Sequence, residues 1–237
     1  MTNLLVKICG ITRPQDAELA IGLGAHAVGF VFWPDSPRRI DPQSAKAIAA
    51  GVPVGVAKVG VFVDETAEEI ARVMDEARLD VAQLHGHESP EFCRELKVRL
   101  SAAARSTDTS FGETRRSLGE GGQADAPDVP RRVIKAIGLK NGGVVNVSEF
   151  DSDIVLLLDA HDAERRGGTG KTVNWDVARD IAAMRPAILA GGLNAANIKL
   201  AIRSVRPYGI DVSSGVESSP GIKDPNRMRS FFEALHD

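Results

Sequence analysis

The stretch AILAGGLNAANIKLAIRSVRPYGIDVSSGVE, residues 187–217, decides the fold. It predicts a short apolar strand at 187–190, a helix over 194–205 and a second short strand at 209–212. A strand, a helix and a further strand in this order predict two parallel strands joined by a helical crossover. Short strands that are largely apolar are typical of a parallel sheet that is buried on both faces.

The same alternation runs along the whole chain. Further strands are predicted at residues 4–8, 26–32, 56–63, 81–84, 133–137 and 154–158, with helical segments between them. Eight such units in 237 residues predict an α/β protein made of a single (β/α)₈ TIM barrel. The alternative is an open doubly wound sheet. It calls for a glycine-rich dinucleotide turn after the first strand, and the CGIT sequence at residues 9–12 is not such a turn.

Three helix starts carry recognisable capping residues. Thr12 followed by Gln15 predicts a capping box. Asp41 before Pro42 predicts an N-cap with proline at the first helical position. Thr66 is predicted to cap a helix whose first turn is acidic.

Residues 101–131, before the fifth strand, interrupt the alternation of strands and helices. The segment is rich in Ser, Thr, Gly and Arg and has no apolar period. A loop of this length without structure is unusual in a compact domain. We therefore predict one barrel domain over residues 1–237 with a flexible insertion at 101–131, on the face opposite the strand ends. A functional arm is the alternative.

Composition narrows the class of partner. The net charge of −3 provides no basic field for nucleic acid. No apolar run approaches the roughly 20 residues of a membrane helix, and no signal peptide is evident. The two cysteines belong to no CxxC pair, so neither a metal nor a disulfide framework is expected. The expectation is a cytoplasmic protein without a cofactor that acts on a small molecule.

Cys9 and Asp159 are the main candidates for chemistry, because the C-terminal strand ends of a barrel build its active site. Cys9 follows the first strand, where a thiol is a nucleophile, a general base or a buried packing residue. Asp159 ends the strand LLLD, where it is an acid or a cap of the next turn. Lys7 shares a face with Cys9 and is predicted to pair with Asp211. Its ammonium would favour the thiolate.

Three glycine-rich turns follow the last three strands and predict a phosphate site. Glycines allow backbone N–H groups to approach an anion closely, and barrels often bind phosphate after strands seven and eight. The alternative is that these are plain turns. The candidate anion-binding residues are Gly168, Thr169, Gly170, Gly191, Gly192, Ser213, Ser214, Gly215 and Val216.

Two further residues follow other strands. Arg38 lies after the second strand, where a guanidinium grips a carboxylate or remains solvated. His85 ends the fourth strand, where it lines the pocket or satisfies a local hydrogen bond.

Together these segments resemble phosphoribosylanthranilate isomerase over nearly the whole chain. The resemblance rests on the order and spacing of VKICGIT at 6–12, GFVFWPDSPR at 29–38, VGVFV at 59–63, QLHG at 83–86, LLLD at 156–159, GGTGKT at 167–172, AGGLN at 190–194 and DVSSGVE at 211–217. The departure is the insertion at 101–131, where the family usually has a short connection.

The resemblance implies an Amadori rearrangement in tryptophan biosynthesis. Asp159 would be the general acid, and Cys9 the general base, with its pKa modestly lowered from the reference value near 8.5. Arg38 would bind the anthranilate carboxylate and the glycine-rich turns the phosphate, with His85 in the pocket. A monomer or homodimer without cofactor or metal is expected. The alternatives are the related isomerase of histidine synthesis, expected to have aspartate in place of Cys9, and a non-catalytic phosphate-binding protein.

Overall fold

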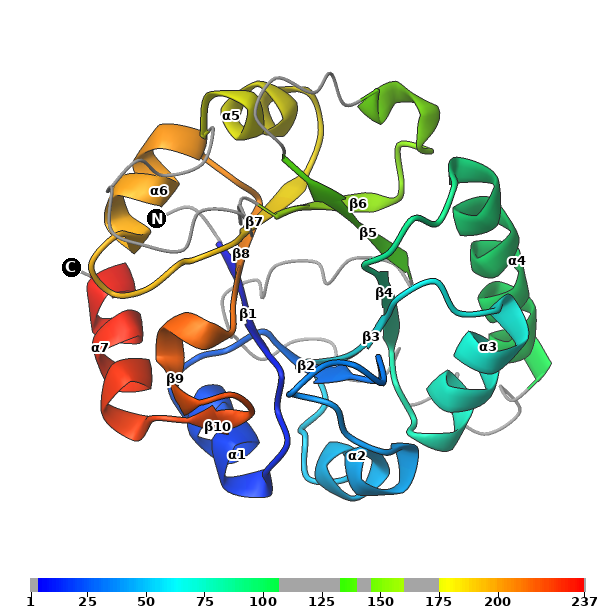
Figure 1. The fold of residues 1–237 in the computed structure, drawn as a ribbon, viewed down its shortest axis with the longest axis horizontal. Coiled ribbons are helices and arrows are strands. Elements are labelled where there is room, and N and C mark those ends of the chain that lie inside the picture. The colour runs from blue at the N-terminus through cyan, green and yellow to red at the C-terminus, as the bar shows by residue number, and fades with distance from the viewer. Residues whose placement is uncertain (1–3, 107–132, 140–145, 160–174, 237) are drawn as a thin grey trace, which may run out of the picture.

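Eight parallel strands form a closed ring with helices around it, in a computed structural model that describes residues 4–106, 133–139, 146–159 and 175–236 (Figure 1). Each strand pairs with the next, and β8 pairs with β1 to close the ring. The strands are β1 Leu5–Cys9, β2 Ala27–Val31, β3 Ala57–Phe62, β4 Val81–Leu84, β5 Val133–Gly138, β6 Val155–Asp159, β7 Ala187–Ala190 and β8 Gly209–Val212. The predicted (β/α)₈ barrel is confirmed.

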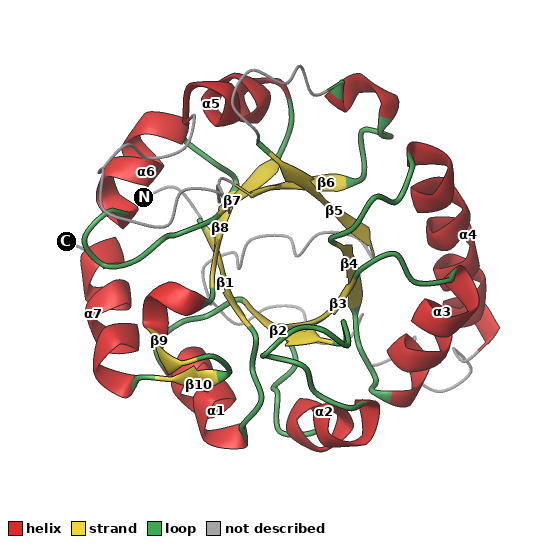
Figure 2. Cartoon of the chain, viewed as in Figure 1, coloured by secondary structure: helices red, strands yellow, loops and turns green. Residues whose placement is uncertain are grey.

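The helices cover the outside of this ring (Figure 2). Their bounds are α1 Pro14–Gly22, α2 Pro42–Ala49, α3 Ala67–Glu76, α4 Pro90–Ser106, α5 Trp175–Met184, α6 Ile198–Val205 and α7 Pro225–His236. Short 3₁₀ turns lie at η1 Val147–Glu149 and η2 Ser214–Val216, and a hairpin of β9 Glu217–Ser219 and β10 Ile222–Lys223 follows β8. None of the helices within the described ranges is long and apolar enough to span a bilayer.

The two faces of each strand meet different surroundings. In β1, Val6 and Ile8 belong to the cluster that packs under the helices, whereas Leu5 belongs to the apolar layer inside the ring. This alternation follows from the period of two along a strand. It places Lys7 and Cys9 inside the barrel, toward the carboxyl end of β1.

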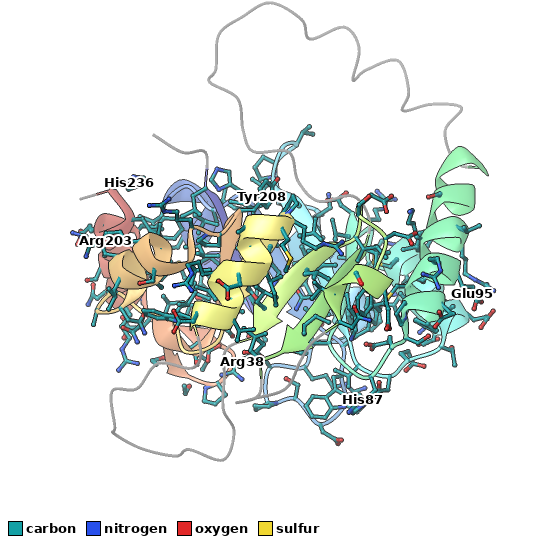
Figure 3. The ribbon with its side chains drawn as sticks, turned by 90° about the horizontal axis from the view of Figure 1, so that it is seen from above. Arg38, His87, Glu95, Arg203, Tyr208 and His236 are labelled. Carbon is teal, nitrogen blue, oxygen red and sulfur yellow. The ribbon has the colours of Figure 1, made fainter. Side chains whose placement is uncertain are left out.

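The ends of the barrel are distinguishable by the residues that lie there. Figure 3 shows Arg38 and His87 at one end and Tyr208, which precedes β8, at the other. The first end holds the loops that follow the strands, where barrel enzymes carry their chemistry.

Two of the three predicted caps are confirmed. Asp41 accepts the backbone N–H of Ser44 at 2.9 Å, and Thr66 accepts that of Glu69 at 3.2 Å. The predicted capping box at Thr12 is wrong, since α1 begins at Pro14 and its N-cap residue is Arg13. The Thr12 hydroxyl instead donates to the carbonyl of Gly221 in the β9–β10 hairpin, a partner 209 positions away.

The predicted end of the helix before the insertion, near Leu100, is wrong. This helix, α4, continues through residues 101–106 instead of ending near residue 100. The sequence AAAR at 102–105 consists of strong helix formers, which explains the extension. Residues 107–131 of the predicted insertion lie outside the described residues.

Candidate active site

Cys9 lies at the carboxyl end of β1, beside a buried ion pair. Lys7 is fully buried, and its Nζ is 2.9 Å from Oδ1 of Asp211 on β8. The predicted pairing of these two residues is therefore confirmed. Gly29 on β2 makes room for both functional atoms, since a Cβ there would lie 3.0 Å from Cys9 Sγ and 3.1 Å from Lys7 Nζ. A thiol and an ammonium thus share one small space inside the barrel.

Burial controls the protonation of this thiol. It raises the pKa of Cys9 above its ordinary value and outweighs the lowering by the Lys7 ammonium. The prediction of a lowered pKa is wrong in direction, although Lys7 acts as expected. Burial lowers the pKa of Lys7, but Asp211 and Cys9 raise it by more, so the lysine remains charged. The site therefore holds a neutral thiol next to a cation that stabilises its thiolate.

Asp159 ends β6 and contacts His85, which follows β4. His85 Nε2 is 3.2 Å from Asp159 Oδ2, and His85 Nδ1 is 3.0 Å from the side-chain nitrogen of Gln83. Both Asp159 and His85 are partly exposed, whereas Gln83 is fully buried. His85 therefore connects the candidate acid to a polar residue of the barrel interior.

Arg38 lies over the residue that follows Cys9. A Cβ on Gly10 would be 2.7 Å from Cδ of Arg38, and Gly10 has φ +75°, a backbone conformation that glycine adopts without strain. The guanidinium donates from Nε and Nη2 to Glu217 at the start of β9, with 2.7 Å between Nη2 and Oε2. The fully buried Lys223 donates to the same carboxylate at 2.8 Å and to the backbone carbonyl of Cys9.

The turns after β7 and β8 are held together at the same end of the barrel. Gly191 and Gly192 have φ of +89° and +67°, which favours glycine. A Cβ on Gly215 would lie 1.8 Å from the carbonyl oxygen of Leu193, so only glycine fits there. Across the part of the chain that the structure describes, the backbone N–H groups of Gly192 and Gly215 have no acceptor. Such free donors suit an anion.

The predicted residues on described strands converge at one end of the barrel. Cys9, Arg38, His85, Asp159 and the turns after β7 and β8 all follow carboxyl strand ends. The predicted turn of Gly168, Thr169 and Gly170 lies outside the described residues.

Three residues of the site were missed by sequence reasoning: Gln83, Glu217 and Lys223. Gln83 gave a signal, because an amide in the apolar strand VAQL needs a partner. Glu217 and Lys223 gave none, since a charged residue near a turn is usually solvated.

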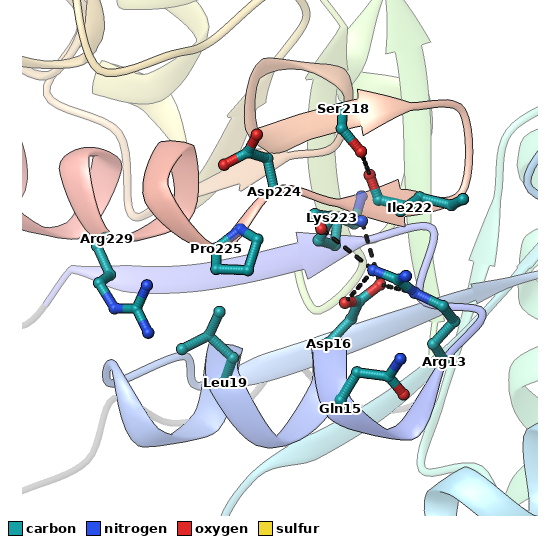
Figure 4. A pocket seen from close by; sticks show the side chains of 10 residues that line it. All are labelled: Arg13, Gln15, Asp16, Leu19, Ser218, Ile222, Lys223, Asp224, Pro225 and Arg229. Carbon is teal, nitrogen blue, oxygen red and sulfur yellow. Dashed lines mark hydrogen bonds and ion pairs between the residues drawn. The ribbon is translucent and has the colours of Figure 1, made fainter.

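A separate groove lies outside the strand ring, between α1 and the segment from the β9–β10 hairpin into α7 (Figure 4). Arg13 and Asp16 line it and form a two-bond ion pair, with Nη2 2.7 Å from Oδ1. Lys223 lines the groove and also belongs to the site at the strand ends, so the groove adjoins that site. Cys93 lies elsewhere, on α4, where burial raises the pKa of its thiol to about 11. The described residues contain no cluster of metal-ligating side chains.

A closed (β/α)₈ barrel with a thiol and a carboxyl group at its strand ends, beside glycine-rich turns with free N–H donors, defines a barrel enzyme with a candidate anion site. The family model for N-(5'-phosphoribosyl)anthranilate isomerase matches residues 6–116 and 124–234. The chain belongs to this family, and the predicted resemblance is confirmed. The match includes most of the predicted insertion and leaves only residues 117–123 between its two parts.

Individual relatives support the same assignment. The N-(5'-phosphoribosyl)anthranilate isomerase of Pelobacter propionicus is 42% identical over 226 residues, which are 95% of this chain and 92% of the relative. A crystal structure of phosphoribosyl anthranilate isomerase with reduced 1-(o-carboxyphenylamino)-1-deoxyribulose 5-phosphate is 34% identical, with a TM-score of 0.72 and 98% of each chain covered. Monomeric variants of the dimeric enzyme from Thermotoga maritima are 33% identical, with a TM-score of 0.70, and the similarity covers 98% of each chain.

Proposed function

We propose that this protein converts N-(5-phosphoribosyl)anthranilate into 1-(2-carboxyphenylamino)-1-deoxyribulose 5-phosphate in tryptophan biosynthesis. The observation that carries this proposal is the position of Cys9 and Asp159 at the carboxyl ends of β1 and β6. The family assignment supplies the reaction, and the reduced product bound by a 34% identical relative supplies the class of ligand.

Asp159 acts first, as the general acid. It donates a proton to the ribose ring oxygen, the ring opens, and the electrons of the anilino nitrogen form a Schiff base. The partial exposure of Asp159 leaves it accessible from the strand-end side, where a substrate enters. General acid catalysis requires a proton on the carboxyl group when the substrate binds.

Cys9 acts second, as the general base. It removes the C2′ proton of the Schiff base, and the resulting enolamine tautomerises to the ketone. The thiolate is the form that accepts this proton, and the Lys7 ammonium stabilises its negative charge. The proton taken by Cys9 and the proton given by Asp159 balance over the turnover, so the reaction needs no redox partner.

Arg38 and the glycine-rich turns hold the two charged ends of the substrate. Arg38 binds the anthranilate carboxylate through donors that Glu217 leaves available. Gly191, Gly192 and the segment from Ser213 to Val216 bind the phosphate through backbone N–H groups, together with Gly168, Thr169 and Gly170. Backbone N–H donors that point into one small space suit a phosphate group.

The remaining expectations concern the location, the domain organisation and the oligomeric state of the protein. We propose a cytoplasmic protein whose residues 1–237 form one barrel domain, with residues 107–131, the part of the predicted insertion at 101–131 that follows α4, as a dispensable insertion. We also propose a monomer or a homodimer. The enzyme of Thermotoga maritima is described as dimeric. Removing residues 117–123, which the family model leaves unmatched, is expected to preserve activity. Loss of folded protein on this deletion would contradict the proposed insertion.

The decisive experiment follows the fluorescence of phosphoribosylanthranilate generated in situ. We expect its rapid loss with the wild-type protein and none above background with Cys9→Ala. Circular dichroism confirms that both proteins are folded. Binding of the reduced product by a wild-type protein without turnover would favour a non-catalytic binding protein instead.

A further inference from the structure

Gln83 presents an unusual polar arrangement inside the barrel. Its side chain is fully buried, and its nitrogen Nε2 lies 3.0 Å from Nδ1 of His85. Its carbonyl oxygen Oε1 is also buried and has no hydrogen-bond partner in the described part of the chain. Buried polar atoms are normally paired, so an orphaned oxygen here requires an explanation.

The contact with Gln83 determines where His85 carries its proton. An amide nitrogen is a donor only, so Nδ1 of His85 must accept and must be unprotonated. The proton of the neutral imidazole then resides on Nε2, which donates to Oδ2 of Asp159 at 3.2 Å. The hydrogen-bond network thus selects the Nε2–H tautomer.

The reverse orientation of the amide is less favourable. It would bring Oε1 to His85 and leave the two N–H donors of the amide buried at the place where Oε1 lies without a partner. Orphaned buried N–H groups are rarer than under-satisfied carbonyl oxygens. The favoured orientation is therefore the one in which Nε2 of Gln83 donates to His85 and Oε1 is left without a partner, because the reverse orientation would leave both N–H donors unpaired.

The tautomer has a consequence for Asp159. With the proton on Nε2, His85 donates to Asp159 and has no lone pair there to accept a carboxyl proton. With the proton on Nδ1, the bare Nε2 would accept a hydrogen bond from the protonated carboxyl group and hold that proton toward the imidazole. Only in the first tautomer does His85 not hold the acidic proton of Asp159.

We propose that Gln83 is a positioning residue that fixes His85 as its Nε2–H tautomer and so keeps the proton of Asp159 for the ring-opening step. Gln83 acts on Asp159 through His85. The proposal rests on the proposed function for its kinetic consequence, whereas the tautomer is a property of the free protein.

Two substitutions separate this role from a merely structural one. Gln83→Met keeps an unbranched side chain of similar length and removes the donor. Gln83→Glu replaces the donor with an acceptor, which favours a proton on Nδ1. Val81→Ala is the control, because Val81 lies on the same strand two residues away and is buried in the apolar layer. It makes none of the hydrogen bonds that link Gln83, His85 and Asp159.

The experiment combines ¹⁵N spectroscopy of histidine-labelled protein with kinetics. We expect the Nε2–H tautomer of His85 in wild type and Val81→Ala, mixed tautomers in Gln83→Met, and the Nδ1–H tautomer in Gln83→Glu. We expect kcat to fall about tenfold in Gln83→Met and about a hundredfold in Gln83→Glu, and the larger effect reaches the lower end of the roughly 10²- to 10⁴-fold contribution of general acid catalysis. The affinity for the reduced product should stay unchanged in both variants.

The outcomes are distinguishable. A wild-type His85 with its proton on Nδ1 would overturn the proposal, as would an altered tautomer with unchanged kcat. A fall in reduced-product affinity that matches the fall in kcat would reveal a structural role and also overturn it. The spectrum needs no turnover, so an inactive wild-type protein with the Nε2–H tautomer would refute the proposed reaction while preserving the effect of Gln83 on His85.

Discussion

Arg38 and Glu217, 179 positions apart in the chain, form a bidentate ion pair at the rim of the barrel. Arg38 uses Nε and Nη2, and 2.7 Å separates Nη2 from Oε2. Its Nη1 donates to no acceptor in the ranges that the structure describes. Because a guanidinium carries five N–H donors in a planar fork, the edge of Nη1 and Nη2 still has donors for a second carboxylate. Glu217 thus orients Arg38 without using all of its N–H donors.

Replacing Arg38 by alanine is expected to weaken substrate binding. A charged hydrogen-bonded contact contributes about 1.5–3 kcal/mol, so KM should rise about 10- to 100-fold while kcat changes less. Steady-state kinetics with phosphoribosylanthranilate measure this effect. Arg39→Ala is the neighbouring control. An unchanged KM in Arg38→Ala would show that Arg38 does not bind the substrate.

Glu217→Gln should destabilise the protein in a pH-dependent manner. Although burial raises the pKa of Glu217, Arg38 and Lys223 lower it by more, so the net pKa is below 4.5. A lowered folded-state pKa contributes stability that is present above the unfolded-state pKa and is lost as pH falls through the folded-state value. The variant should lose about 3 kcal/mol at neutral pH, and this difference should shrink below about pH 4. Urea unfolding across this range would contradict the assignment if the difference stayed constant.

The ring of strands was predictable because each strand is a short apolar run with a helix after it. The predicted bounds 81–84, 187–190 and 209–212 coincide with β4, β7 and β8. The pairing of Lys7 with Asp211 was also predictable, since closure of a barrel places β8 beside β1 with matching faces. Pattern and topology alone therefore define the barrel and the pairing of Lys7 with Asp211 inside it, but not the buried Gln83.

The finer geometry of the site was not predictable. Lys223 reaches the backbone carbonyl of Cys9 across 214 positions, and no local pattern encodes such a contact. The β9–β10 hairpin, to which Lys223 belongs, also accepts a hydrogen bond from the Thr12 hydroxyl, which therefore does not cap the helix as predicted. The direction of the Cys9 pKa shift depends on opposing effects of burial and Lys7, whose balance requires coordinates.

The raised pKa of Cys9 predicts an alkaline rise in activity. Below that pKa the fraction of thiolate increases about tenfold per pH unit, so kcat/KM should rise between about pH 7 and pH 9 over the range in which Asp159 keeps its proton. Rates at several pH values, with stability measured at each, provide the profile. Cys9→Ala should show only background over the same range. A flat profile would mean either that the thiolate is already formed at neutral pH or that Asp159 loses its proton over the same range.

Lys7→Met should reduce both activity and stability. The variant keeps the length of the side chain but removes the cation that stabilises the thiolate, so kcat should fall. It also leaves Asp211 buried without its partner, which costs about 3–5 kcal/mol. Adding Asp211→Asn should restore stability but not activity, because the amide needs no counter-charge. Urea unfolding and the fluorescence assay separate the two effects. Wild-type behaviour of Lys7→Met in both assays would show that this ion pair serves neither purpose.

Asp159→Asn should abolish most of the turnover while preserving binding. The amide occupies nearly the same volume, and its carbonyl oxygen still accepts from Nε2 of His85, so the geometry of the contact is retained. It cannot donate an acidic proton to the ring oxygen, and loss of a general acid lowers kcat by about 10²- to 10⁴-fold. Titration with the reduced product should give the wild-type affinity. Asp180→Asn on the exposed surface of α5 is the control and should keep full activity. Retained turnover in Asp159→Asn would transfer the acid role to another group and leave Asp159 as a turn-capping residue.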